Sequence, residues 1–178
     1  SFPTRRSSDL LDSAETMDSQ REQSDLGETR SILVFRLGEE WFGLATGSLV
    51  EVAPMNPIHS LPHQRSRALQ GVTNVRGALV ACLSLGELLD LEPGAAPVSE
   101  RRVVPRMLII SAAGGPVVAP VEEVDGIHAI PLARILPPNH ADGQASRRHV
   151  AGVLQWRERS ITLLDEGPLL QAVARSLA

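Results

Sequence analysis

Strand-length runs of apolar residues, separated by glycine, proline or charged residues, follow one another from Ser31 almost to the end of the chain. Such runs with turn residues between them are typical of β-strands. So many short strands favour small β-barrels over a parallel sheet, and 178 residues suffice for two barrels. The predicted strands are Ile32–Leu37, Trp41–Leu44, Leu49–Ala53, Leu69–Arg76, Ala78–Leu83, Met107–Ser111, Val117–Val121, Val124–Ile130, Val150–Trp156 and Ser160–Leu164.

Two segments carry helix signals. Ser84 is followed three residues later by Glu87, which is the pattern of a capping box and predicts a short helix to about Leu91. A C-terminal helix is predicted over Pro168–Ser176, because proline is favoured in the first turn of a helix. Its apolar residues are expected to share one buried face, namely Leu169, Leu170, Val173 and Leu177.

A stretch rich in proline, alanine and glycine, Glu92–Arg102, predicts the boundary between two halves of one domain that spans residues 31–178. We expect a first barrel half over residues 31–91 and a second over residues 103–178, the latter including the C-terminal helix. Residues 1–30 carry seven acidic residues against four Arg and few large apolar residues, so they are expected to form a disordered acidic tail. The first ten residues contain no Met, and we interpret them as foreign to the native sequence.

The composition excludes several classes of function. All 17 basic residues are Arg, so a phosphate-loop lysine, Schiff-base chemistry and a kinase-type Lys–Glu pair are ruled out. The net charge of −4 gives no basic field to attract nucleic acid or an anionic membrane. The single cysteine, Cys82, cannot form an intramolecular disulfide, which suits the reducing cytoplasm where we expect this protein.

No arrangement of residues predicts catalysis, a cofactor or a metal ion. His59 and His63 have the spacing of a helical metal pair, but Pro62 between them is incompatible with that helix. Cys82 lies in an apolar strand and is expected to be buried and inert. The acidic group Glu122, Glu123 and Asp125 is interpreted as a solvated strand edge. The chain is therefore predicted not to be an enzyme.

One stretch remains, Gly71-Val72-Thr73-Asn74-Val75-Arg76-Gly77. Asn74 and Arg76 are two apart, so in a strand both side chains would point to one face. An unpaired guanidinium in a dry core would cost on the order of several kcal/mol, so this face is expected to be accessible. By itself the pattern fits either an interaction surface or an ordinary strand facing water.

The same stretch, followed by Ala78–Leu85, resembles the hallmark of the CheW family of chemotaxis coupling proteins. Trp41-Phe42-Gly43-Leu44 resembles the opening strands of that family, Ser60-Leu61-Pro62 a loop after its third strand, and Ser160–Leu170 its closing segment. The resemblance extends from Ser31 to Leu177. It implies two intertwined five-stranded SH3-like barrels with short helices.

The resemblance also implies a function, that of a non-catalytic adaptor that couples the cytoplasmic tip of chemoreceptors to the regulatory domain of a CheA-type histidine kinase. Such a protein would be cytoplasmic and reach membrane-associated receptor arrays through its partners. Asn74, Arg76 and Gly77 would lie in the receptor- and kinase-facing region. Leu49 and Glu51 would lie on a neighbouring strand that lines the same groove, with Glu51 as a charged partner of Arg76.

The sequence departs from the family pattern at several positions. Pro120 lies in a strand, which predicts that this strand is at a sheet edge. The His59–His63 loop and the chain end resemble the accessory CheW-like protein of Wsp-type surface-sensing systems, so both a flagellar motor and a diguanylate cyclase are possible outputs. The alternative function is a nucleic-acid-binding small barrel. That reading needs a basic, aromatic-studded face, and a salt-sensitive shift of labelled single-stranded DNA would support it.

Overall fold

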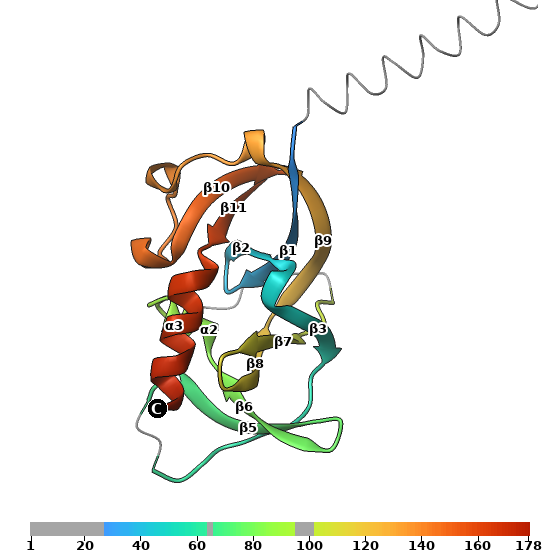
Figure 1. The fold of residues 1–178 in the computed structure, drawn as a ribbon, viewed down its shortest axis with the longest axis vertical. Coiled ribbons are helices and arrows are strands. Elements are labelled where there is room, and N and C mark those ends of the chain that lie inside the picture. Colours follow the sequence, from blue (N-terminus) through green and yellow to red (C-terminus); the bar gives the residue numbers. More distant parts are fainter. Residues whose placement is uncertain (1–26, 64–65, 95–101) are drawn as a thin grey trace, which may run out of the picture.

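A computed structural model describes residues 27–63, 66–94 and 102–178 of the chain. These residues form eleven strands, two α-helices and four short 3₁₀ helices, confirming the mostly β prediction (Figure 1). The α-helices are α2 (Leu85–Leu88) and α3 (Glu166–Leu177), and none in the described part of the chain is long and apolar enough to span a membrane. The strands are β1 (Thr29–Leu37), β2 (Glu40–Ala45), β3 (Leu49–Pro54), β4 (Ile58–His59), β5 (Leu69–Val75), β6 (Ala78–Leu83), β7 (Arg106–Ala112), β8 (Gly115–Val121), β9 (Glu123–Pro131), β10 (Val150–Trp156) and β11 (Arg159–Leu164).

The strands form two curled sheets. Barrel A has the strand order β10-β11-β2-β1-β9, and a bridge between Leu136, which follows β9, and Val153 on β10 brings its two ends together. Barrel B has the order β3-β7-β8-β6-β5-β4, and the chain runs directly from its one edge strand, β3, to the other, β4. The two-residue strand β4 adds a sixth strand to the five that the family resemblance implied.

The predicted halves differ from the observed sheets. Barrel A takes β1 and β2 from the start of the chain and β9, β10 and β11 from its end, while barrel B consists of the strands between them. The chain therefore changes barrel at the 3₁₀ helix η1 (Thr46–Ser48) and again at Glu122, not at Glu92–Arg102. Proline and glycine mark where a strand ends, but they carry no information about which distant strand it pairs with. Residues 95–101 of the predicted boundary lie outside the described residues.

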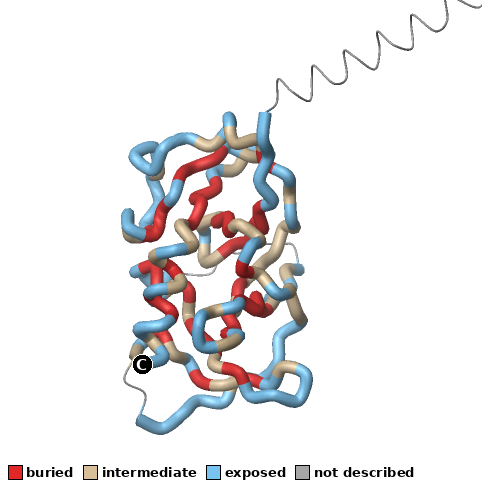
Figure 2. Tube along the Cα trace, in the orientation of Figure 1, coloured by how far each residue is buried: buried red, intermediate tan, exposed pale blue. Residues whose placement is uncertain are grey.

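Strands at the contact between the barrels are buried on both faces. In β1, Ile32 and Val34 face the interior of barrel A, whereas Leu33 and Phe35 face a core shared by the two barrels. In β7, Leu108 likewise packs in the shared core and Ile109 inside barrel B. Alternate residues of a strand point to opposite sides, so a strand between two cores needs apolar residues throughout. This explains the uninterrupted apolar runs in the sequence, which form the buried centre of the molecule (Figure 2).

Both predicted helices are present, but each differs in detail from the prediction. The Ser84 hydroxyl accepts a hydrogen bond from the Glu87 backbone N–H at 3.3 Å, as a capping residue does. The Ser84 N–H donates to the Ala68 carbonyl rather than to the Glu87 side chain, so only half of the capping box forms, and α2 ends at Leu88 instead of Leu91. In α3, Leu177 is 41% exposed, contrary to the prediction.

Two further predictions are wrong. Thr29 and Arg30, placed in the tail, belong to β1 and pair with Pro131 and Ile130, because backbone pairing needs no apolar side chain; residues 1–26 lie outside the described residues. Strand β8, which carries Pro120, lies between β7 and β6 rather than at an edge. It pairs with β6 only at Val118, so the missing N–H of Pro120 interrupts no hydrogen bond to that neighbour.

Candidate interaction surface

The tip of the β5–β6 hairpin is built by Asn74, Arg76 and Gly77. β5 ends at Val75, and Arg76 and Gly77 form a two-residue turn with φ of 52° and 86°. Positive φ at both turn positions is the geometry that joins twisted antiparallel strands most tightly. The Asn74 side-chain oxygen accepts a hydrogen bond of 2.9 Å from the Gly77 N–H and fixes the turn.

Arg76 therefore does not lie on the strand face where alternation placed it, because the strand has already ended. Its guanidinium instead forms an ion pair with Glu51, as the family resemblance implied. The Arg76 side chain is 76% exposed and that of Glu51 only 28%. An exposed pair of this kind contributes at most about 1 kcal/mol to stability, so the guanidinium stays available to a partner.

Glu51 lies on β3, beside a β-bulge. The register between β3 and β7 shifts between Leu49 and Glu51, so Val50 is an extra residue without an opposite partner. Bulges redirect side chains at sheet edges, and Val50 is 56% exposed at this one. Leu49, which we predicted in the same site, is half-buried and packs against the shared core, so the structure separates it from the exposed group.

The segment between β3 and β4 is held against β5. The Asn56 side chain donates to the Asn74 carbonyl at 2.8 Å, and the hydroxyl of the fully buried Thr73 donates to the Pro57 carbonyl at 2.9 Å. Gly71 has φ of +152°, and a Cβ there would lie 2.1 Å from the His59 carbonyl oxygen. The first glycine of the motif thus permits a close backbone approach that any side chain would block.

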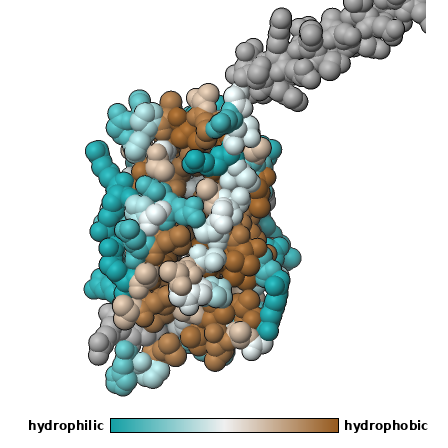
Figure 3. All heavy atoms as spheres, viewed as in Figure 1, coloured by the Kyte–Doolittle hydropathy of each residue, from teal (hydrophilic) through white to brown (hydrophobic). Residues whose placement is uncertain are grey.

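Sequence reasoning missed two apolar members of this surface. Leu79 is 70% exposed and is the cross-strand partner of Asn74, so the two side chains lie on the same exposed face. The hairpin register would have revealed Leu79, whereas the bulge that exposes Val50 has no signature in the sequence. We define the hairpin-tip surface as Val50, Glu51, Asn74, Arg76, Gly77 and Leu79. Figure 3 shows apolar residues at the molecular surface at this end, over β5 and β6.

A family profile for the CheW-like domain matches residues 31–174. The chain belongs to this CheW-like family. A protein from Rhizobium etli named probable chemotaxis protein CheW is 27% identical over 136 residues, which cover 76% of this chain and 84% of that protein. The crystal structure of the scaffolding protein TtCheW from Thermoanaerobacter tengcongensis superposes with a TM-score of 0.64 at 22% identity, over 79% of this chain and 92% of that one. This last likeness supports the fold.

A cleft of about 440 Å³ lies between the barrels of the CheW-like chain. Its described lining includes Leu37 from barrel A and Met55 and Pro105 from barrel B, with the carboxylates of Glu87 and Glu122 at its sides. None of the five residues predicted as the site appears in this lining. The hairpin-tip surface and the cleft are therefore separate features of the molecule.

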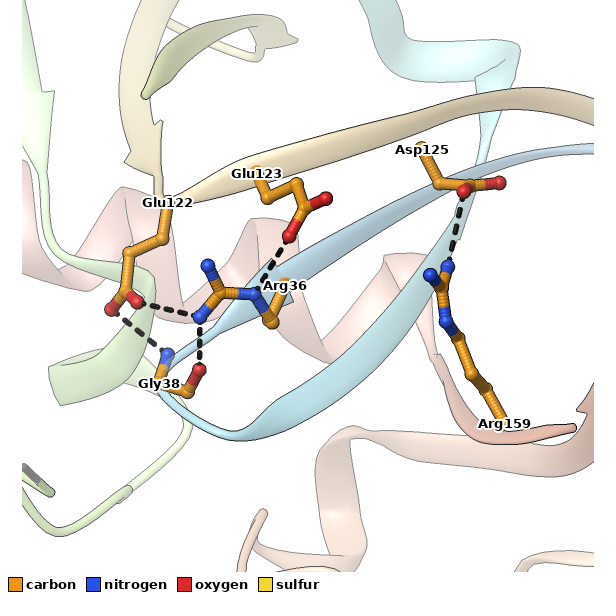
Figure 4. Close-up of polar contacts among 6 residues, drawn as sticks. All are labelled: Arg36, Gly38, Glu122, Glu123, Asp125 and Arg159. Atoms are coloured by element: carbon orange, nitrogen blue, oxygen red, sulfur yellow. Dashed lines mark hydrogen bonds and ion pairs between the residues drawn. The ribbon is translucent and has the colours of Figure 1, made fainter. Parts of the chain in front are cut away.

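The acidic group that we interpreted as a solvated edge has a different role in the CheW-like fold. Arg36, whose side chain is only 10% exposed, binds Glu122 and Glu123 at 3.0 Å each and also donates to the Gly38 carbonyl (Figure 4). The Gly38 N–H in turn donates to Glu122 at 2.9 Å. The interpretation was wrong for Glu123 and Asp125, whose side chains are only 16% and 19% exposed, whereas that of Glu122 is 46% exposed. The sequence does not reveal Arg36 as the partner of Glu122 and Glu123, because it lies 86 and 87 residues earlier in the chain.

Asp125 takes part in a neighbouring network, binding Arg159 at 3.0 Å and His128 at 2.8 Å. Burial disfavours the charged carboxylate, but the hydrogen bonds and charges of His128 and Arg159 outweigh it, so the pKa of Asp125 lies below its ordinary value. Burial raises the pKa of the Cys82 thiol to about 11, in keeping with an inert cysteine. Among the described residues, no three His, Cys, Asp or Glu side chains are grouped as metal ligands would be.

Proposed function

We propose that this protein is a non-catalytic adaptor that couples the cytoplasmic tip of a chemoreceptor to the regulatory domain of a CheA-type histidine kinase. Its membership of the CheW-like family, over residues 31–174, supports the scaffold role. The names of the two relatives, a chemotaxis protein and a scaffolding protein, point in the same direction. The observation that carries the proposal is the hairpin-tip surface, where an exposed Arg–Glu pair lies beside exposed apolar residues.

The hairpin-tip surface has the chemistry of a protein interface. Arginine is among the residues that most often dominate binding energy, and here a carboxylate holds it in place at the surface. Leu79 and Val50 offer apolar area without being needed by any core. A partner that fits this surface presents an apolar patch with an acceptor for the remaining guanidinium N–H groups. A single small patch of six residues suggests micromolar affinity for each partner, and avidity would strengthen binding in a larger assembly.

The test is to replace Arg76 with Ala and measure binding to receptor and kinase fragments separately. We expect an affinity loss of about ten-fold or more for at least one partner, because a central interface arginine contributes roughly 1–3 kcal/mol. Arg30→Ala is the matched control, since Arg30 is also an exposed arginine but lies on β1 in barrel A. Unchanged binding of the Arg76→Ala protein to both partners would reject the hairpin-tip surface as the coupling site.

A further inference from the structure

A second surface of the molecule, on barrel A, combines arginine with tryptophan. Trp156, at the end of β10, has two guanidinium groups close to its ring, that of Arg134 at 5.8 Å and that of Arg157 at 5.7 Å from the ring centre. Both arginines are exposed. A cation over an indole face is attracted by the ring and is held in a defined position. We call Arg134, Trp156 and Arg157 the Arg–Trp patch.

An acidic residue near this patch, Asp125, is already engaged by other side chains. Asp125 binds both Arg159 and His128, and the His128 ring lies 5.6 Å from the Trp156 ring. Neither Arg134 nor Arg157 forms an ion pair with a carboxylate among the described residues. Counting Arg134, Arg157 and Arg159 against Asp125 and the adjacent Glu158 leaves a local charge of +1, in a chain with a net charge of −4.

The sequence before β1 carries a charge complementary to this patch. Residues 11–26, hereafter the acidic segment, contain one arginine, Arg21, and five carboxylates, a net charge of −4 (five acids less one Arg). The five acids are Asp12, Glu15, Asp18, Glu22 and Asp25.

The acidic segment is tethered beside the patch. The Leu132 N–H donates to the Glu28 carbonyl at 2.9 Å, and Arg134 follows two residues after Leu132, in the same 3₁₀ helix. β1 therefore begins where β9 ends (Figure 1). Asp25 is three residues before Glu28, a reach of up to about 10 Å. A tether this short gives an effective concentration on the order of millimolar, so a contact whose Kd lies below that concentration would be largely formed.

We propose that the acidic segment docks on the Arg–Trp patch of the same molecule, with its carboxylates pairing with Arg134 and Arg157. The charge of the segment, the uncompensated arginines and the position of Glu28 all support this occupant. The proposal concerns barrel A and is independent of the coupling role assigned to the hairpin-tip surface on barrel B.

Tryptophan fluorescence tests the docking directly, because the chain has only two Trp residues and both lie in this region. Trp156 is in the patch, and the Arg159 guanidinium lies 3.9 Å from the ring centre of Trp41. We expect acrylamide to quench the full chain less than a chain that begins at Gly27. The difference should vanish as ionic strength rises from about 0.01 M to about 1 M, where the Debye length falls from about 30 Å to about 3 Å.

Charge variants identify the contact. In the full chain, the double substitution Arg134→Glu and Arg157→Glu, or conversion of the five acids to Asn and Gln, should raise quenching to the level of the shortened chain. The matched control is Arg67→Glu with Arg175→Glu, two exposed arginines outside the patch, which should leave quenching unchanged. Equal quenching of the full and shortened chains at low salt would overturn the proposal. So would a difference that survives the Arg134/Arg157 reversal, or one that grows with protein concentration and so reports contact between two copies.

Discussion

Arg36 in barrel A and Arg76 in barrel B are both paired with glutamate, but their surroundings give them opposite roles. The Arg36 side chain is 10% exposed and satisfies two carboxylates and a carbonyl group, whereas the Arg76 side chain is 76% exposed and meets one carboxylate. Removing the partner of a buried charge costs stability, because nothing else solvates that charge. When one member of an exposed pair is removed, water solvates the other at little cost. Burial, rather than residue type, therefore separates an arginine that holds the fold from one that can bind a partner.

The largest expected effect comes from Arg36→Ala. It removes the positive charge that Arg36 places against Glu122 and Glu123 near the junction of the barrels, and breaking a buried ion pair costs about 3 kcal/mol or more. For a domain of this size the melting temperature should fall by roughly 6–12 °C. The measurement is thermal unfolding of the Arg36→Ala and Arg76→Ala proteins side by side. The Arg76→Ala substitution is expected to cost less than about 1 kcal/mol. Equal losses of stability would remove the distinction.

Glu51 tests whether the exposed ion pair with Arg76 prepares the surface for partner binding. Glu51→Ala should free the Arg76 side chain without creating a buried unpaired charge, so stability should change by less than about 1 kcal/mol. We expect binding to receptor or kinase fragments to weaken by about ten-fold or less, because positioning is lost while the arginine remains. Isothermal titration with Glu51→Ala, Arg76→Ala and the double variant gives their coupling. Strictly additive losses would show that the ion pair does not organise the surface.

A smaller effect is expected from pH, through the buried His149. Burial lowers the pKa of its imidazole below the ordinary 6.5, with Arg148 and Arg175 adding to the shift and Asp90 and Asp165 opposing it. Between the two pKa values the unfolded chain binds the proton and the folded chain does not. Stability is therefore full above about pH 6.5 and is lost as the pH falls below it. Denaturant unfolding at several pH values should show a weaker pH dependence for His149→Leu than for the native chain, and an unchanged slope would refute this.

The smallest effect concerns residues 1–26. A few exposed charge pairs contribute at most about 1 kcal/mol, so a chain that begins at Gly27 should melt within a few degrees of the full chain, by about 2–4 °C per kcal/mol. Cutting further, to Ser31, removes the β1 residues Thr29 and Arg30 and should lower the melting temperature more. A fall of more than about 5 °C for the shorter deletion would show that the tail packs as part of the fold.

The sequence predicted local features well and distant pairing poorly. Strand positions followed from apolar runs and turn residues, and the turn at Ala113 and Gly114, between β7 and β8, is of the glycine-containing kind that such signals specify. The Arg76–Glu51 contact was predicted only through the family resemblance, since no spacing rule links a residue on β3 with one in the turn between β5 and β6. The assignment of strands to barrels failed because it depends on contacts such as those of β1 with β9, about 90 residues apart. The bulge at Val50 was invisible for the same reason, since a bulge belongs to a pair of strands rather than to one of them.

The interleaving of the two barrels determines how the polypeptide can be divided. A cut between Gly94 and Arg102 gives one piece with β1 to β6 and another with β7 to β11, and each piece carries strands of both barrels but a complete set of neither. Leu33 on one piece and Leu108 on the other belong to the same hydrophobic core, so the cut divides that core between the two pieces. Neither piece can then bury its apolar surface alone, and reassembly restores both barrels together. We therefore expect the two pieces to fold only when they associate, as the two fragments of a split reporter protein do.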